Sequence, residues 1–543
     1  MIHSNRNTWI TLSVLAAALF VKSVYFRQMT DMDALSLVPL MAAYLSVAAV
    51  AVALAMVAWI PRRWPSVVLL VLTDLWLIAG IWYYAANNLW VNWAAVQTLT
   101  ELKGFESSII AYLAWSQLIL PLTTLIALAA MYSLPLPCAT KRHKWGATMI
   151  AATLYLGAVV GWLLCPLDEE AKNRAMKAEE KYLIRTHSSL WQIGRIGYEA
   201  LLENHYKRNA KRPFTARERE IMDAVYRDSV APSAPEGHLV YILVESLETW
   251  ALEATDVQGK RIGAHLLHYA ESHPTLYVPA VESQQKYGRS GDGQLITQTG
   301  LLPLSSGVAC RQYGENVYPN LAHFYPFGVV LNPYRIPVWN QKVVTYSYGF
   351  KQLYSPQMLI NLSDSVVIDR TIGRLRKANE PIMVLALTID THTPFHSHRD
   401  SAVFEDGKYS ASETDYLRSV RYTDRQIGRF LSWADTASVM HDATIVITAD
   451  HNQFPREKGH GLCPLIVRSP RITHAVRYEE CLQMDIFPTV LNAIGQTDYR
   501  WKGFGIDLLD EQQAAQQLKR RPISAKEAYS LSDKLIRTNY FAQ

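Results

Sequence analysis

Long apolar runs are the feature that most restricts how this chain of 543 residues can fold. Five of them are long enough to cross a bilayer, which takes a helix of about 20 residues. A cleaved secretion signal is a single short apolar run, so it cannot account for five. We therefore predict a multi-pass membrane domain over residues 1–165, with spans at Trp9–Phe26, Leu35–Ile60, Ser66–Ala86, Ser108–Leu134 and Trp145–Cys165.

Basic residues in the short loops predict how these spans are oriented. Arg6 precedes the first span, and the loops that follow the second and fourth spans contain Arg62, Arg63 and Lys141–Lys144. Short loops rich in lysine and arginine remain on the cytoplasmic side of a membrane. We therefore expect a cytoplasmic N-terminus, with the loop Asn87–Glu106 and everything after the fifth span on the outer side.

Charge and cysteine content argue against two classes of protein. The net charge of +5 is modest, and no basic patch is interleaved with aromatic residues, so we predict no nucleic-acid partner. The five cysteines show neither a CxxC motif nor zinc-finger spacing. One disulfide is compatible with this pattern, whereas a disulfide-stabilised framework is not.

The sequence after residue 165 has the mixed composition of a soluble domain. Residues 166–237 are charged and alanine-rich, and their helical spacing predicts a connector lying along the membrane surface. Over residues 238–515, short continuous apolar runs alternate with helical segments, which predicts an α/β fold with a largely parallel sheet. A charged, helical tail is expected over residues 516–543. The predicted strands are His238–Val244, Ile382–Ile389, Ala443–Ala449 and Leu465–Val467.

Carboxylate and imidazole side chains directly follow three of the predicted strands. Glu245 follows the first, Asp390 and His392 follow the second, and Asp450 with His451 follows the third. Ligands of such sheets bind beyond the carboxyl ends of the strands, and all five side chains carry groups that could bind a metal there. Simpler roles are also open: Glu245 as a helix cap, Asp450 and His451 as a turn, and His392 as a structural histidine.

A glycine-rich segment, Tyr287–Leu304, places Ser290 between glycines and in front of a helix-like run. Glycines let the backbone approach a ligand closely, and the N–H groups at a helix start favour an anion such as phosphate. With Glu245, Asp450 and His451 as ligands, Zn²⁺ or Mn²⁺ would lower the pKa of the Ser290 hydroxyl and turn it into a nucleophile. The alternative interpretation is an ordinary turn before a core helix.

Four short motifs occur in the order known from one protein family. They are VESLE around Glu245, GRSGD around Ser290, THTPF around His392 and ADH ending at His451. The chain thereby resembles the lipoteichoic acid synthase family of the alkaline phosphatase and sulfatase superfamily. The resemblance implies one divalent ion, Mn²⁺ or Zn²⁺, bound by Glu245, Ser290, Asp450 and His451, with His392 near the phosphoryl group.

Four further residues are candidates for substrate contacts. Trp339 and Asn340 resemble the family's Trp-Asn pair in the phosphoglycerol pocket. Arg289 precedes Ser290 in the GRSGD motif, and His460 lies in a GHG turn shortly after the Asp-His pair. The resemblance therefore implies a phosphate-bearing substrate held by aromatic, amide and basic side chains.

The chain also departs from the family pattern at the same pocket. Serine replaces the usual threonine nucleophile, Gln341 and Lys342 stand where arginine is common, and the upstream pocket histidine is replaced near Asn332. A phosphoglycerol headgroup would lose contacts through these changes. The resemblance therefore leaves phosphoglycerol and phosphoethanolamine open as the transferred headgroup.

The resemblance implies a transferase that moves this headgroup from a membrane phospholipid, through phospho-Ser290, to a cell-envelope glycan or lipid acceptor. It also implies a bacterial inner-membrane protein whose catalytic domain is extracytoplasmic. Two alternatives are a sulfuric or phosphoric ester hydrolase of the same superfamily and a non-catalytic protein that binds lipid headgroups. The sulfatase modification motif is absent, because Gly291, Asp292, Gly293 and Gln294 follow Ser290.

Overall fold

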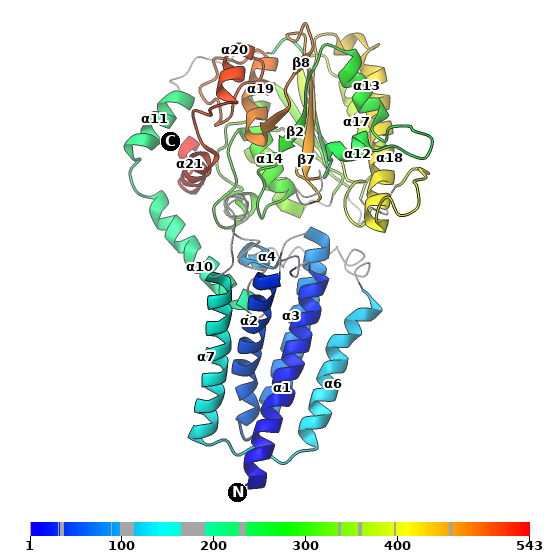
Figure 1. Ribbon diagram of the computed structural model, residues 1–543. Helices are drawn as coiled ribbons and strands as arrows, with labels where there is room; N and C mark the ends of the chain where they lie inside the picture. The colour runs from blue at the N-terminus through cyan, green and yellow to red at the C-terminus, as the bar shows by residue number, and fades with distance from the viewer. Residues whose placement is uncertain are drawn as a thin grey trace. The chain divides into compact units, whose positions relative to one another are not determined.

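The structure is a computed structural model of the whole chain, shown in Figure 1. Contacts divide the chain into two compact units: Met1–Val96 with Glu106–Ala200, and Gln97–Phe105 with Leu201–Gln543. The second unit includes the C-terminal residues that the sequence analysis separates as a tail. The structure describes residues 2–30, 32, 37–87, 90–97, 113–163, 191–226, 235–334, 338–356, 361–395, 398–454 and 460–542.

The first unit consists of long apolar helices. Four stretches are long and apolar enough to cross a membrane: Arg6–Met29, Leu40–Trp59, Trp64–Ala85 and Trp115–Tyr132. They match the first four predicted spans. The predicted fifth span begins inside α7 and extends beyond the described residues, and the described part of α7 does not meet the same criterion. The helices of this unit are α1 (Ile2–Met29), α2 (Leu37–Ala55), α3 (Trp64–Asn87), α4 (Trp93–Gln97), α6 (Ile119–Tyr132) and α7 (Lys141–Leu163).

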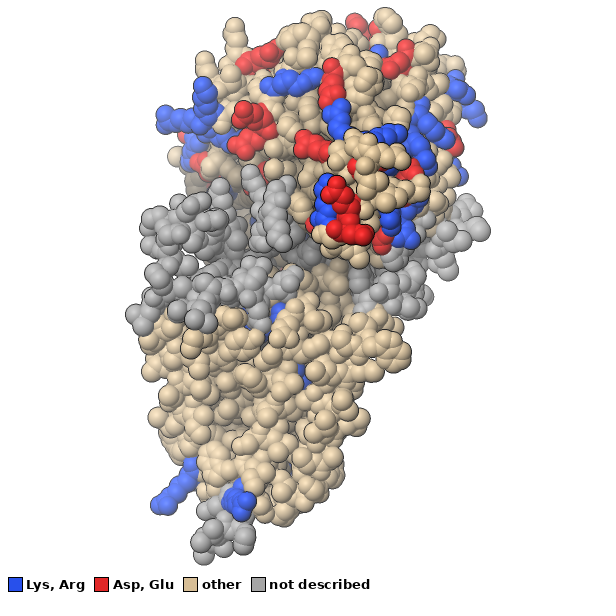
Figure 2. Space-filling model, turned by 45° about the vertical axis from the view of Figure 1, so that its right-hand side comes forward, with Lys and Arg blue, Asp and Glu red and all other residues tan. Residues whose placement is uncertain are grey.

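The surface of this first unit is apolar. Leu72, Leu75, Leu125 and Ile126 each expose more than half of their area. Figure 2 shows few charged side chains on the described part of the unit that faces the viewer. A contiguous apolar surface of this kind suits contact with lipid, so the four spans predicted from the sequence are supported by exposure as well as by length.

A buried polar cluster joins three of the helices inside the first unit. Lys22 of α1 forms an ion pair with Asp74 of α3 and also donates to the carbonyl oxygen of Leu120. The Thr124 hydroxyl of α6 accepts a hydrogen bond from Lys22 Nζ at 2.8 Å and donates to Asp74 Oδ2 at 2.6 Å. Because charges inside an apolar bundle are costly unless they are paired, this cluster fixes how the three helices pack.

The second unit is built on a sheet of nine strands, which confirms the predicted α/β class. The strand order is β4-β3-β5-β1-β6-β7-β2-β8, with β9 paired to β2. The strands from β4 to β6 run parallel, whereas β7 is antiparallel to β6 and β2. The bounds are β1 Leu239–Val244, β2 Leu276–Glu282, β3 Phe327–Leu331, β4 Gln352–Tyr354, β5 Ile382–Leu387, β6 Thr444–Ala449, β7 Leu462–Arg468, β8 Val476–Arg477 and β9 Glu480–Leu482.

The central strands are buried because helices cover both faces of the sheet. Every residue of β1, β5 and β6 is buried, as their unbroken apolar runs predict. In Figure 1, α13, α17 and α18 lie on one side of the sheet and α14 and α19 lie on the other. The helices of this unit include α11 (Ala216–Val225), α12 (Thr249–Glu253), α13 (Ala264–Ser272), α14 (Ser290–Thr299), α15 (Ala309–Gln312), α16 (Gln341–Ser347), α17 (Asp364–Arg376), α18 (Ala411–Ala434), α19 (Ile486–Ala493), α20 (Glu511–Gln517) and α21 (Ala525–Arg537).

Parts of the predicted connector and tail are also described. Residues 166–190 and 227–234 of the connector lie outside the described residues, and the rest forms α10 (Trp191–Ala210) and α11. The tail forms α21, which packs beside the segments that flank α14. Ser532 exchanges two hydrogen bonds with the backbone of Leu302, and the Tyr529 hydroxyl donates to the carbonyl oxygen of Gln284. The tail therefore supports the segment that contains Ser290.

Candidate active site

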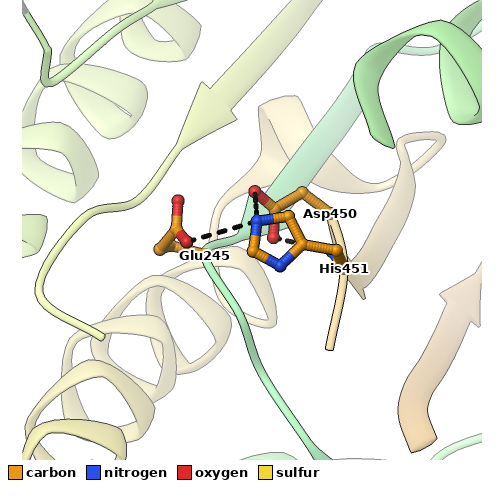
Figure 3. A group of neighbouring side chains, drawn as sticks. All are labelled: Glu245, Asp450 and His451. Carbon is orange, nitrogen blue, oxygen red and sulfur yellow. Dashed lines mark hydrogen bonds and ion pairs between the residues drawn. The ribbon is translucent and has the colours of Figure 1, made fainter. Parts of the chain in front are cut away.

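Three predicted ligands meet at the carboxyl ends of two neighbouring strands. Glu245 follows β1, and Asp450 and His451 follow β6, to which β1 is paired up to its last residue. Figure 3 shows the three side chains facing one another. His451 Nε2 lies 3.6 Å from Glu245 Oε1 and 3.5 Å from Asp450 Oδ2. All three are buried, and one ligand atom from each lies within 4.8 Å of the others. We refer to them as the ligand group.

Backbone hydrogen bonds orient the ligand group. The N–H groups of Ser246 and His451 both donate to Asp450 Oδ1 at 2.8 Å, which turns Oδ2 towards His451 Nε2. The Nδ1 atom of His451 lies 3.0 Å from the carbonyl oxygen of Asn452, so it donates there and leaves the lone pair on Nε2. Burial lowers the pKa of His451 to about 3, which keeps the ring in the neutral form that binds metals.

Ser290 lies at the start of α14 and reaches the ligand group. Its Oγ is 3.3 Å from Glu245 Oε2 and 3.3 Å from His451 Nε2. The start of a helix presents N–H groups that stabilise an anion. The Ser290 hydroxyl thus lies beside Glu245, Asp450 and His451, three side chains that could hold a metal ion. A hydroxyl next to such a group has the chemistry needed to act on a phosphate ester.

The turn before Ser290 is strained and tightly packed. Arg289 has a positive φ of 44°, which is unusual for a residue with a side chain. The Asp292 carboxylate accepts the N–H groups of Lys286 and Gly288 at 2.9 Å and closes the turn. A Cβ on Gly293 would lie 2.3 Å from the carbonyl oxygen of Asp450, so only glycine allows α14 to approach the strand end this closely.

Tyr334 is a site residue that the sequence analysis missed. Its hydroxyl donates a hydrogen bond to Glu245 Oε2, the oxygen that also faces Ser290. Tyr334 lies just after β3, a strand that was not among the predicted ones. Recognising Phe327–Leu331 as a parallel strand would have placed the residues after it at the same edge of the sheet.

A pocket beside Ser290 brings together neutral polar and aromatic side chains. Trp339 lines it, as the resemblance implies, and has a positive φ of 54°. Gln341 also lines it, and its amide forms two reciprocal hydrogen bonds of 3.0 Å with the amide of Gln294. Asn340 donates from its side chain to the carbonyl oxygen of Cys310 at 2.9 Å, so its amide supports the pocket through the backbone. The other polar lining residues are Glu245, Ser290, Gln294, Asn332, Tyr334, Thr388 and Asp450.

Asp390, whose carboxylate also follows a strand, does not belong to the ligand group. Its Oδ2 accepts the N–H of Asp364 at 2.7 Å, and its Oδ1 pairs with His398 Nδ1 at 2.8 Å. Asp364 Oδ1 in turn accepts the N–H of Ile389 at 2.7 Å. The Asp390 side chain thus faces the start of α17, where it accepts the Asp364 N–H. We call these two residues the Asp364–Asp390 pair.

The remaining predicted residues lie around this centre. The His392 ring meets the Tyr334 ring edge-on, with centroids 6.2 Å apart, and so lies next to the side chain that contacts Glu245. Arg289 is buried, and its positive charge adds to burial in lowering the pKa of His451. His460 stacks on the indole ring of Trp250, with centroids 4.2 Å apart, in a cluster of aromatic rings.

Comparisons with known proteins agree with this geometry. The Sulfatase family matches residues 320–496, a range that includes Asp450 and His451. Lipoteichoic acid synthase 1 of Bacillus subtilis is 21% identical over 314 residues, which cover 51% of this chain and 49% of that protein. Lipoteichoic acid synthase of Staphylococcus aureus is 21% identical over 313 residues, covering 51% and 48%. The chain thus spans about half the length of the curated relatives it matches.

A solved structure shares the fold over most of the chain. The integral membrane protein lipooligosaccharide phosphoethanolamine transferase A from Neisseria meningitidis aligns with a TM-score of 0.54 and 12% sequence identity. The alignment covers 89% of this chain and 95% of that chain. At this identity the likeness concerns the fold alone.

Proposed function

We propose that the chain is a lipoteichoic acid synthase-like member of the alkaline phosphatase and sulfatase superfamily and that it is a metal-dependent phosphotransferase of the membrane. The Sulfatase match and the curated relatives support this proposal. It takes phosphoglycerol or phosphoethanolamine from a membrane phospholipid and passes it, through phospho-Ser290, to a cell-envelope glycan or lipid. The observation that supports this proposal best is the position of Ser290 Oγ, 3.3 Å from both Glu245 Oε2 and His451 Nε2.

The donor atoms fit a divalent ion. Two ligands at about 2.1 Å from an ion in tetrahedral geometry lie roughly 3.4 Å apart. Four of the six separations among Ser290, Glu245, Asp450 and His451 are 3.3 to 3.6 Å, counting either oxygen of Glu245. Two carboxylates, a neutral imidazole and a hydroxyl suit Mn²⁺ or Zn²⁺. Such an ion, when bound, lowers the pKa of the serine hydroxyl and neutralises phosphate charge.

The protein's own groups supply the rest of the reaction. Ser290, having lost its proton to solvent, forms a bond to phosphorus while the bond from phosphorus to the diacylglycerol oxygen breaks. The N–H groups at the start of α14 face the phosphate oxygens. His392 donates a proton to the departing diacylglycerol oxygen and then removes one from the acceptor hydroxyl, which attacks phospho-Ser290 and releases the serine.

The pocket offers contacts for the part of the headgroup beyond the phosphate. Trp339 and Tyr334 provide aromatic faces, and Asn332 provides an amide. Gln341, which stands where arginine is common in the family, is bound to Gln294, so this part of the pocket carries no positive charge. These contacts suit a small polar headgroup and leave phosphoglycerol and phosphoethanolamine as the two candidates. Arg289 and His460 are proposed to contact the substrate from the loops around the pocket.

The proposed location follows from the basic loops of the first unit. The N-terminus lies in the cytoplasm, and the second unit faces the outer side of the bacterial inner membrane, where lipid donor and envelope acceptor are available. This orientation predicts that a protease added to intact spheroplasts cleaves the second unit. Protection of that unit would contradict it.

Release of diacylglycerol tests the proposed activity. The purified chain in mixed micelles with Mn²⁺ and labelled phosphatidylglycerol or phosphatidylethanolamine should release diacylglycerol from one of the two. Ser290→Ala should lower the rate by roughly a thousandfold or more, because the covalent route is lost. Ser283→Ala, a serine that precedes the same loop, is the matched control and should keep the wild-type rate. Equal rates for the Ser290 variant and the wild type would contradict the proposal.

A further inference from the structure

Glu248 is a buried carboxylate that the proposed reaction does not use. It lies three residues after Glu245, at the start of α12, and its side chain is fully buried. Its Oε1 accepts the backbone N–H groups of Gln453 at 2.7 Å and Phe454 at 2.6 Å. Its Oε2 accepts the backbone N–H of Gly461 at 3.0 Å and the indole N–H of Trp250. One side chain therefore receives four N–H donors.

The three backbone donors come from both ends of one segment of the chain. Gln453 and Phe454 follow His451 by two and three residues, and Gly461 directly follows His460. The carboxylate itself belongs to the turn that contains Glu245. Glu248 thus connects the two strand ends that contribute the ligand group, and it does so through hydrogen bonds to a charged acceptor, which are stronger than neutral ones.

Aromatic contacts extend this connection to His460. Trp250, whose N–H group donates to Glu248, stacks on the His460 ring with an interplanar angle of 19°. The ring of Phe454 meets the edges of both Trp250, at 5.8 Å, and His460, at 5.6 Å. The position of the His460 ring therefore depends on the same hydrogen bonds that hold the backbone after His451.

The turn around Glu248 is also fixed from α18. The hydroxyl of Tyr416 accepts the backbone N–H of Glu248 at 3.0 Å and donates to the carbonyl oxygen of Ser246 at 2.7 Å. Ser246 has a positive φ of 52°, so this turn holds an uncommon backbone conformation. The backbone that carries the Glu248 carboxylate is thus held on both sides by Tyr416.

We propose that Glu248 is a positioning residue for the transfer reaction. It holds the backbone after His451 and the His460 ring in register with Glu245, so that the ligands and the substrate-contacting histidine keep one geometry. This inference rests on the proposed function for its effect on turnover. Its effect on the segment 453–461 and on metal affinity does not depend on turnover, because both follow from the hydrogen bonds alone.

The test compares Glu248→Gln with Glu253→Gln, an exposed glutamate on the same helix. In the glutamine variant an NH₂ group replaces one of the two carboxylate oxygens. That NH₂ group faces N–H donors, so the hydrogen bonds to the replaced oxygen are lost. In the full-length protein in detergent, hydrogen–deuterium exchange of the peptide containing Gln453 to Gly461 should become at least about tenfold faster. Mn²⁺ affinity should fall about tenfold and kcat/KM by about 10- to 100-fold. Glu253→Gln should change none of these quantities.

The outcomes separate the two proposals. Unchanged exchange, or faster exchange with unchanged Mn²⁺ affinity and turnover, would overturn the positioning role. Absent turnover in the wild type would instead contradict the proposed function, while exchange and Mn²⁺ affinity still decide the role of Glu248. Should Glu248→Gln not fold, Trp250→Phe removes the indole N–H donor and keeps a smaller aromatic ring beside His460. It should speed exchange at Gly461 and lower kcat/KM about threefold, and no change in either would overturn the proposal.

Discussion

The ligand group and the Asp364–Asp390 pair lie at the same edge of the sheet and use their oxygens differently. In the ligand group, backbone N–H groups hold one oxygen of Asp450 and turn the other towards His451 Nε2. In the Asp364–Asp390 pair, backbone N–H groups, Thr423 and His398 occupy the carboxylate oxygens. In the ligand group, oxygen and nitrogen atoms with available lone pairs therefore face one another. In the Asp364–Asp390 pair, the carboxylate oxygens are occupied by hydrogen bonds that hold α17 against the end of β5.

This difference shows why a carboxylate after a strand is not by itself a ligand. Asp390 and Asp450 are both buried, both follow parallel strands, and both look alike in the sequence. They differ in whether both carboxylate oxygens accept hydrogen bonds from other parts of the chain, as in Asp390, or only one does, as in Asp450. The ligand group should therefore lose metal when altered, whereas the pair should lose stability.

We expect the largest effect, on Mn²⁺ affinity, when Asp450→Asn is compared with Asp390→Asn. Asp450→Asn should lower Mn²⁺ affinity by more than roughly a hundredfold, because it removes a charged ligand from the centre. Asp390→Asn should leave Mn²⁺ affinity within about twofold of the wild type and lower the free energy of unfolding by about 1–3 kcal/mol. Isothermal titration with Mn²⁺ and thermal unfolding measure the two quantities. An equal loss of Mn²⁺ affinity in both variants would contradict the difference in role between the ligand group and the Asp364–Asp390 pair.

A smaller effect is expected from a residue that touches the ligand group without belonging to it. Tyr334→Phe removes only the hydroxyl that donates to Glu245 Oε2. Partners that orient a ligand typically change metal affinity by about 10–100-fold, so we expect roughly a tenfold loss. The exposed Tyr346 is the matched control, and Tyr346→Phe should bind Mn²⁺ as the wild type does. An unchanged affinity for Tyr334→Phe would show that Glu245 is held by its other contacts.

The smallest effect concerns pH and the Asp364–Asp390 pair. Burial and the nearby charge of Asp390 raise the pKa of Asp364. The folded chain therefore keeps a proton that the unfolded chain loses near pH 4, so the free energy of unfolding falls as pH rises above about 4. One such group contributes a slope of at most about 1.4 kcal/mol per pH unit.

Asp390→Asn should flatten this slope, because it removes the neighbouring charge that helps to raise the pKa of Asp364. Unfolding midpoints between pH 4 and pH 7 measure it, with the exposed Asp223→Asn as control. A slope as steep in Asp390→Asn as in the wild type would assign the pH dependence to other groups.

The sequence could predict the parts of this protein that follow from local patterns. Apolar runs predict four of the helices that can span a membrane, and unbroken runs predict the buried strands β1, β5 and β6. Their parallel pairing brings Glu245 next to Asp450 and His451. Ser290 joins them because a glycine, Gly293, lets α14 approach the strand end.

The rest depends on where distant segments return, which no local pattern contains. Asp390 follows a strand as Glu245 does, yet its oxygens are taken by Asp364 and His398. Tyr334 reaches Glu245 from the turn after β3, a five-residue strand that was not among the predicted ones. The role of Glu248 depends on Gly461, more than 200 residues along the chain. Such contacts are tertiary, so they become visible only in the folded structure.

The most direct test of the account is intact and peptide mass spectrometry of the purified protein after incubation with phospholipids and Mn²⁺ or Zn²⁺. The account predicts a covalent adduct on the peptide containing Ser290, absent in Ser290→Ala, whose mass distinguishes phosphoglycerol from phosphoethanolamine. Asp390→Asn should form the same adduct, and Asp450→Asn should not. Diacylglycerol release without any adduct on Ser290, under conditions that trap the intermediate, would contradict the central claim that this serine is the nucleophile.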